Sequence, residues 1–298
     1  MANFALKVIR LGFLALQAVS PQLAGRAAFL LFCRTPSQRP KGGKAKAAHA
    51  AGAARLAGAE RFVLKLSSGA KAHAYRLNGG ALGKRKRYLV THGWGSSAVY
   101  MADLVSTLAA TGAEVVALDF PGHGRARGRF LHMGLAVEAI AAAEERFGAF
   151  DAAIGHSFGG AALMVSAAAL LPDAAPVTGE RLVLIGAPSE MAWLFTDFGR
   201  LIGLGAAAQA VLENEVHRVT GRRTRGFRRR QYGRYDLEFG ARGSRGGRQG
   251  SLVGACQALW CGGQACTAVL GERLRASAHR RRGSGPWSSR GLPRRGGA

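Results

Sequence analysis

The stretch GHSFGG at residues 155–160 decides the fold. An apolar run at 151–154 precedes it and predicts a buried strand, and another at 161–171 follows it and predicts a buried helix. A strand, a G-x-S-x-G turn and a helix in this order are typical of a nucleophile elbow, in which the tight turn strains the serine backbone. This context favours a chemical role for Ser157 over the alternative of a chance Gly/Ser turn.

The residues around Ser157 follow from the geometry of such a turn. Side chains at Gly155 and Gly159 would collide with the strand or the helix, so glycine is required at both positions. The Phe158 N–H lies at the N-terminus of the predicted helix, where it can face a developing negative charge. His156 is interpreted as a supporting residue.

A second glycine-rich turn, HGWGSS at 92–97, follows another predicted strand. Its glycines let the backbone bend sharply, so that the Trp94 N–H can face the space above the serine. We predict that the Trp94 and Phe158 N–H groups form an oxyanion hole; the alternative is a turn capped by a core tryptophan. His92 and Gly93 are interpreted as supporting this loop.

Strands and helices alternate through the middle of the chain. Strands are predicted at 88–91, 114–119, 151–154 and 181–185, and helices at 98–110, 134–147 and 158–171. An antiparallel hairpin is predicted before them, at 62–66 and 72–77. Continuous apolar strands that alternate with helices indicate an α/β protein with a mostly parallel sheet covered on both faces. Ligands bind beyond the carboxyl ends of such strands, where each glycine-rich turn lies.

A third turn, DFPGHG at 119–124, also follows a strand. A loop this rigid more often supports a pocket than reacts. We therefore predict structural roles for Asp119 and His123, and no role as general base for His123.

The three turns, in this order and spacing, resemble those of the α/β-hydrolase superfamily, and most of all its esterase, lipase and monoacylglycerol-hydrolase-like branch. The resemblance covers about residues 62–188. It implies an α/β-hydrolase fold, a serine nucleophile at Ser157, an acyl-enzyme intermediate, a small-molecule ester substrate, and neither cofactor nor metal. A serine in place of aspartate at the turn argues against the epoxide-hydrolase and dehalogenase branches. Arg125 departs from the small residue that the family often has there.

The chain divides into four predicted segments, at 1–35, 36–60, 61–221 and 222–298. The first is apolar and predicts two short helices, with Ser20 as N-cap and Pro21 at the first helical position. A packed helical hairpin, a membrane-surface anchor through residues 4–33 and a cleaved signal peptide stay open as alternatives. The second segment is a linker or a weak helix. The third is the hydrolase core, with a partial lid at about 189–221 formed by helices at 191–203 and 205–219.

The excess positive charge lies mainly in the last segment. Residues 222–298 contain 18 Arg, no Lys and 3 acids, a net +15 of the +25 of the whole chain. The segment contains no recognisable nucleic-acid-binding module, so no specific nucleic-acid binding is expected, and we predict a disordered tail. Four cysteines in 298 residues resemble neither a disulfide framework nor a zinc site, which favours a cytoplasmic location.

The triad acid and histidine are the missing parts of the pattern. The family places them after two strands beyond the lid, but no apolar strand is predicted after residue 222. Chain order would allow Asp236 as the acid and His279 as the base. We offer the hypothesis that the tail is translated out of frame. Shifted by one nucleotide, codons for residues 273–279 can encode GFGHRRI, and those for 236–241 can encode ILSLVH, which the nucleotide sequence can test.

Three classes of function follow. A serine hydrolase is favoured, with weak activity and stability because the acid, the base and the closing strands are lacking. An inactive remnant of that hydrolase comes second. A nucleic-acid-binding protein that uses its arginine-rich tail comes third, and salt-sensitive DNA binding would favour it.

Overall fold

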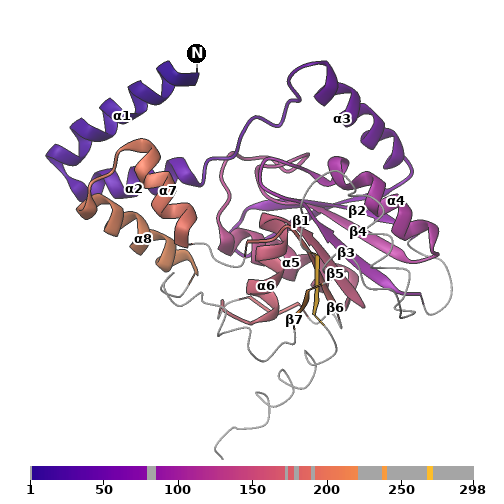
Figure 1. Ribbon diagram of the computed structural model, residues 1–298. Helices are drawn as coiled ribbons and strands as arrows, with labels where there is room; N and C mark the ends of the chain where they lie inside the picture. Colours follow the sequence, from indigo (N-terminus) through magenta and orange to yellow (C-terminus); the bar gives the residue numbers. More distant parts are fainter. Residues whose placement is uncertain are drawn as a thin grey trace, which may run out of the picture.

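The computed structural model describes residues 2–78, 85–171, 174–177, 181–188, 192–220, 237–239 and 267–270. These residues form an eight-stranded sheet with the order β1-β2-β4-β3-β5-β6-β8-β7 (Figure 1). The prediction of two N-terminal helices, a hairpin and four apolar strands is confirmed. Asp236 and His279 lie outside the described residues.

Four parallel strands form the centre of the sheet. They are β3 (Arg87–Thr91), β4 (Glu114–Asp119), β5 (Ala152–His156) and β6 (Arg181–Ile185). Their interiors are almost completely buried, which explains why their central residues are apolar in succession rather than at alternate positions. Because they are parallel, their carboxyl ends meet at one edge, and the three glycine-rich turns all leave the sheet there.

The predicted hairpin is formed by β1 (Glu60–Lys65) and β2 (Lys71–Leu77), which pair antiparallel. Gly69 has a φ of 82° in the connecting turn, a conformation that glycine adopts without strain. Strand β2 also pairs antiparallel with β4, so the hairpin extends one side of the parallel sheet.

Helices cover both faces of the sheet. On one face, α5 (Met133–Phe147) and α6 (Phe158–Ala167) share a core cluster with the strands. On the other, a 3-10 turn, η1 (Ala98–Met101), and α4 (Ala102–Ala110) complete a second cluster. The sheet is therefore the middle layer of three.

One sequence-based boundary is wrong, and one open alternative is decided. Helix α6 was expected to reach residue 171 but ends at Ala167, because Ala169 takes a left-handed φ of 50°. The second segment, for which a linker and a weak helix are the two alternatives, contains the helix α3 (Gly43–Arg55), which agrees with the second alternative. This helix packs closely on η1: a Cβ at Gly52 would lie 2.0 Å from the Val99 carbonyl oxygen.

A separate helical layer lies beside the sheet, at the left of Figure 1. It consists of α1 (Ala2–Val19), α2 (Pro21–Phe32), α7 (Ala192–Ile202) and α8 (Ala206–Thr220). Its core includes Phe13, Phe29, Phe195 and Leu212, so the first two helices pack against the predicted lid helices. No helix in the described ranges is both long enough and apolar enough to cross a bilayer.

Helix α2 begins as the sequence predicts, and the residues after its end are held by backbone pairing with a distant loop. The Ser20 hydroxyl caps α2 by accepting the Leu23 N–H at 3.3 Å, and Pro21 is its first residue. After α2 the chain runs antiparallel to residues 129–131. There the Thr35 N–H donates to the Arg129 carbonyl at 3.1 Å and the Leu131 N–H to that of Cys33 at 2.9 Å.

The segment after residue 222 contains two short strands, which the sequence analysis did not predict. Strand β8 (Thr267–Leu270) pairs antiparallel with β6, and β7 (Leu237–Phe239) pairs antiparallel with β8. Both are short, and β8 runs against the direction of the four central strands. They extend the sheet beyond β6.

Candidate active site

Ser157 lies at the junction between β5 and α6, and its backbone is strained as expected. Its φ of 50° and ψ of −119° are sparsely populated by residues other than glycine. Two hydrogen bonds fix this conformation. The Ser157 N–H donates to the Ile185 carbonyl at 2.8 Å, and the Ser157 carbonyl accepts the Ala161 N–H at 3.1 Å as the first bond of the helix. The neighbouring strand and the helix together hold the turn.

Glycines allow the backbones around this turn to approach closely. A Cβ at Gly155 would lie 2.5 Å from Gly160 Cα, and a Cβ at Gly159 would lie 2.5 Å from the His92 carbonyl oxygen. Both distances are far below van der Waals contact, and both neighbours are backbone atoms that cannot rotate away. No side chain fits at either position.

The loop at 92–97 lies directly against Ser157. A Cβ at Gly93 would be 3.2 Å from the Ser157 Cβ and 2.9 Å from His156 Nδ1. Trp94, the next residue, is 37% exposed, so the alternative of a core tryptophan is wrong. Its ring contacts the rings of Phe158 and His123 edge-on, each at 5.5 Å between centroids. The backbone of this loop therefore lines the same space as the serine.

Two histidines connect the loops around the turn. His92 is completely buried; its Nε2 accepts the Phe120 N–H at 3.2 Å, so we assign the proton to Nδ1, which contacts the Gly93 carbonyl at 2.8 Å. Burial lowers the pKa of His92 to about 3. His123 Nε2 accepts the Gly95 N–H at 3.0 Å, and burial lowers its pKa too. Each ring accepts an N–H from another loop at Nε2, and its Nδ1 contacts a carbonyl of its own loop, Gly93 for His92 and Pro121 for His123.

Asp119 holds the third turn from inside. Its two carboxylate oxygens accept the Ala98 N–H at 2.6 Å and the Arg125 N–H at 2.9 Å, and the side chain is fully buried. Burial raises the pKa of Asp119 to about 6, although these two bonds and one from Tyr75 favour the charged form. A Cβ at Gly124 would overlap the carboxylate, so the loop wraps closely around it.

The remaining predicted residues are placed less completely. His156 is half-buried, which lowers its pKa. The Ser157 hydroxyl does not cap α6. The expected acid, Asp236, and the expected base, His279, lie outside the described residues, and their roles stay predictions.

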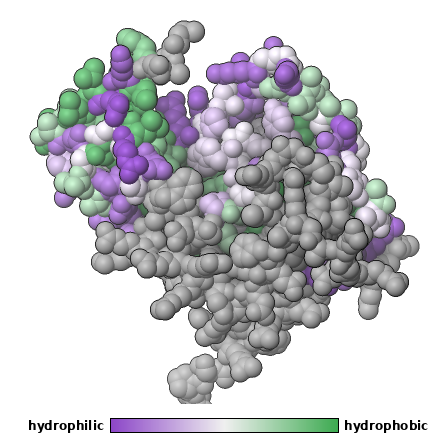
Figure 2. Space-filling model, in the orientation of Figure 1, coloured by the Kyte–Doolittle hydropathy of each residue, from purple (hydrophilic) through white to green (hydrophobic). Residues whose placement is uncertain are grey.

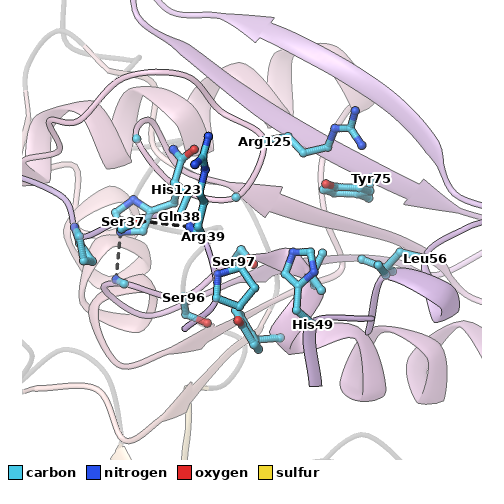
Figure 3. A pocket seen from close by; sticks show the side chains of 18 of the residues that line it. Ser37, Gln38, Arg39, His49, Leu56, Tyr75, Ser96, Ser97, His123 and Arg125 are labelled. Atoms are coloured by element: carbon cyan, nitrogen blue, oxygen red, sulfur yellow. Dashed lines mark hydrogen bonds between the residues drawn. The ribbon is translucent and has the colours of Figure 1, made fainter. Parts of the chain in front are cut away.

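A cavity of about 150 Å³ opens beside the loop at 92–97 (Figure 3). It lies between residues 36–40, α3 and the turn that contains His123. Among the residues that the structure describes, its lining includes Arg39, Arg61 and Arg125 but no Asp or Glu. Such a lining suits an anionic or neutral polar group. Sequence analysis missed this cavity because its walls come from segments far apart in the chain, one of them interpreted as a linker.

Comparisons with known proteins come from sequence and from structure. The sequence model of the alpha/beta hydrolase family matches residues 88–294, which includes most of the arginine-rich segment. No curated protein matches the chain.

Solved structures similar to the chain include three hydrolases. The Pyrococcus furiosus esterase Pf2001 is 19% identical, with a TM-score of 0.35 over 45% of this chain and 52% of that one. An epoxide hydrolase from an endophytic Streptomyces is 24% identical, with a TM-score of 0.32 over 40% and 35%. A predicted CIB-like hydrolase from Thermoplasma acidophilum is 14% identical, with a TM-score of 0.36 over 48% and 82%. The chain spans about half the length of the esterase.

Proposed function

This chain belongs to the alpha/beta hydrolase family, and from that premise we propose that it is a serine hydrolase that cleaves a small ester through an acyl-enzyme on Ser157. The strained turn carries the proposal. A φ of 50° at a serine costs stability, and the contacts of β5, α6 and the loop at 92–97 all maintain it. A purely structural turn would have no need of a serine at the strained position.

In the proposed reaction the Ser157 hydroxyl oxygen attacks the ester carbonyl carbon and loses its proton to a general base. The tetrahedral intermediate collapses, the bond to the alcohol oxygen breaks, and the alcohol leaves with a proton. Water then attacks the acyl-enzyme, releases the carboxylic acid and restores the serine. In chain order, Asp236 and His279 are the candidates for the acid and the base.

Two backbone N–H groups would stabilise the negative oxygen of the intermediate. Phe158 is the first residue of α6, and N–H groups in the first turn of a helix have no acceptor within the helix. The second donor would be the N–H of Trp94, which follows the glycine packed against Ser157. Each such donor contributes a few kcal/mol to the transition state. His92, His123 and Asp119 would position these loops without exchanging protons with the substrate.

Labelling by a fluorophosphonate probe tests the proposal, because the probe reacts with an activated serine and needs no knowledge of the substrate. We expect the probe to label the full chain, and Ser157→Ala to abolish the label. Ser68→Ala is the matched control, since Ser68 is an exposed serine in the β1–β2 turn, and it should leave labelling unchanged.

A folded chain that takes no label would overturn the proposal in favour of the inactive remnant. We expect turnover of short acyl esters to be slow even where labelling succeeds. A serine without an efficient base keeps only the modest catalysis of the oxyanion hole and binding. Rapid turnover would show that the triad is complete.

A further inference from the structure

The outward side of α1 is apolar, whereas the exposed side of a surface helix is normally polar. Phe4 is 74% exposed, Leu11 66% and Val19 83%. In Figure 2 hydrophobic residues gather on the surface of the helical layer, at the upper left of the molecule. Isolated exposed apolar residues are common, but a contiguous group marks an interaction surface.

Helical geometry places these side chains in one stripe. Positions 4, 8, 11, 15 and 19 fall within an arc of about 80° when each residue turns the helix by 100°. We call the stripe formed by Phe4, Val8, Leu11, Ala15 and Val19 the outer face. The opposite side of α1 carries Ile9, Phe13 and Leu16, which pack in the core of the helical layer. Packing within the described part of the chain therefore explains only one of the two apolar sides of this helix.

Positive charge accompanies the outer face. Lys7 and Arg10 are exposed on α1 next to the stripe. Arg26 on α2 is also exposed, although it forms an ion pair with Glu215 at 3.3 Å. Glu60 is the first acid in the chain. Residues 1–59 therefore carry only positive charges among their ionised side chains. A helix with an apolar stripe, flanking cations and no acids complements a surface that is anionic at its boundary and apolar beneath it.

We propose that α1 docks through its outer face on the surface of an anionic lipid bilayer and lies in the plane of the interface. The apolar stripe enters the acyl boundary, while Lys7 and Arg10 contact the lipid phosphates. The exposed side of α2, with Leu23 (54% exposed), Arg26 and Leu30 (58%), repeats the same combination of apolar and cationic residues. This proposal concerns binding and is independent of the chemistry at Ser157.

Docking would also bring the lid helices to the lipid. The Gln17 side chain of α1 joins the turn between α7 and α8 through two hydrogen bonds: its Nε2 donates to the Gly203 carbonyl at 3.0 Å, and its Oε1 accepts the Gly205 N–H at 2.7 Å. Leu201, just before this turn, is 52% exposed. Because α1 and this turn are held together, a bilayer under α1 lies close to the lid.

Co-sedimentation of the full chain with vesicles tests the proposal. The probe vesicles are phosphatidylcholine alone and phosphatidylcholine with phosphatidylglycerol, at about 0.15 M salt to weaken non-specific attraction by the arginine-rich segment. The double substitution Phe4→Gln and Leu11→Gln removes apolar area but keeps the charge. Val63→Gln is the matched control, since Val63 is 55% exposed on β1.

We expect the wild-type chain to bind the anionic vesicles, the double variant to bind at least about tenfold less, and the Val63 variant to bind like wild type. Lys7→Gln should weaken binding to anionic vesicles and leave any binding to neutral ones unchanged. Equal binding by the double variant and the wild type would overturn the proposal, because positive charge alone would then account for vesicle binding.

Depth of insertion provides a second measurement that does not depend on overall affinity. Tryptophan at position 11, from Leu11→Trp, should be quenched by lipids with brominated acyl chains, whereas Val63→Trp should not. The alternative occupant of the outer face is a second copy of this chain. A concentration-dependent dimer in the absence of lipid, lost in the Phe4→Gln and Leu11→Gln variant, would overturn the lipid proposal in favour of that interface.

Discussion

Helices α1 and α6 are both apolar around most of their circumference, yet their surroundings are opposite. Eight of the ten residues of α6 are buried, between the sheet and the neighbouring helix α5. Helix α1 buries one side in the helical layer and leaves the other open, with Phe4 and Val19 among the most exposed apolar side chains. The difference shows that an apolar helix sequence predicts an apolar contact but does not identify the partner. For α6 the partner is the rest of the chain, whereas the outer face of α1 has no such partner in the described residues.

The same distinction applies to function. Helix α6 is buried over most of its length and can therefore hold Ser157 in a strained conformation. Helix α1 has no partner in the described part of the chain on its outer face, so that face is free for another surface. The proposed nucleophile Ser157 is thus held by a buried helix, whereas the proposed lipid contact is an exposed helix face.

The largest expected effect comes from placing the same methyl group in both helices. Gly160→Ala in α6 would put a Cβ 2.7 Å from Ala187 Cβ and 2.9 Å from the Gly155 carbonyl oxygen, whereas a Cβ at Gly12 in α1 has nothing within 4 Å. We expect Gly160→Ala to lower the free energy of unfolding by about 1–3 kcal/mol through overpacking. Gly12→Ala should raise it by about 0.5–1 kcal/mol through helix propensity. Urea denaturation measures both free energies. If the two variants changed stability in the same direction, the contrast between a tightly packed α6 and an open side of α1 would be wrong.

The second largest effect is expected from lowering the pH, which changes the free energy of unfolding through the buried groups His92 and Asp119. The pKa of His92 is about 3 in the fold, below its ordinary value of 6.5, so the unfolded chain binds its proton first and stability falls as the pH drops below 6.5. Asp119 acts in the opposite direction between about pH 4 and 6, because its raised pKa makes the folded chain bind its proton first. Each contributes a slope of at most about 1.4 kcal/mol per pH unit.

Asp119→Asn separates the two contributions. It removes the opposing slope, so the loss of stability on acidification from pH 6 to 4 should be steeper in the variant than in wild type. Denaturation by urea at a series of pH values gives the two slopes. Parallel slopes would mean that Asp119 has an ordinary pKa.

Relief of backbone strain should have a smaller effect. Ser157 and Ala169 both have a φ of 50°, which glycine adopts freely. Ser157→Gly and Ala169→Gly should each raise the free energy of unfolding by about 1 kcal/mol. Only the first should abolish labelling by a fluorophosphonate. A Ser157→Gly variant less stable than wild type would show that the hydroxyl stabilises the turn.

The smallest effects are expected for the candidate acid and base. In the chain, Asp236 comes before β7 rather than after it, and the strand that precedes His279, β8, runs antiparallel to the central strands. We therefore expect Asp236→Asn and His279→Ala to change ester turnover by no more than about twofold. A loss of about 10²-fold or more in the histidine variant would identify it as the general base and show that the hydrolase is intact.

The sequence was sufficient for the parts of the fold that depend on local pattern. Continuous apolar runs predicted the central strands, and the glycines around Ser157 predicted the tight turn, because only the absence of a Cβ permits the close approach seen at Gly155. The N-cap at Ser20 was predicted for a similar local reason. These features need only a few neighbouring residues to be recognised.

Features that depend on distant residues were missed. The composition of the α3 segment leaves a linker and a weak helix open, and the contact of α3 with Val99, which the sequence does not reveal, is visible only in three dimensions. The cavity beside Gly95 combines Arg39 with Arg125, whose proximity no local pattern reveals. The antiparallel strand β8 has no alternation or apolar run long enough to indicate pairing with β6.

The backbone pairing of residues 33–35 with 129–131 has a practical consequence for trimming the protein. The apolar start of the chain invites removal as though it were a processed leader. A version shortened to begin after residue 35 would lose this pairing and would leave Leu212 and Val216 of α8 without the covering α2. Such a truncation should yield insoluble material, because it would expose apolar side chains of α8 that α2 buries in the full chain.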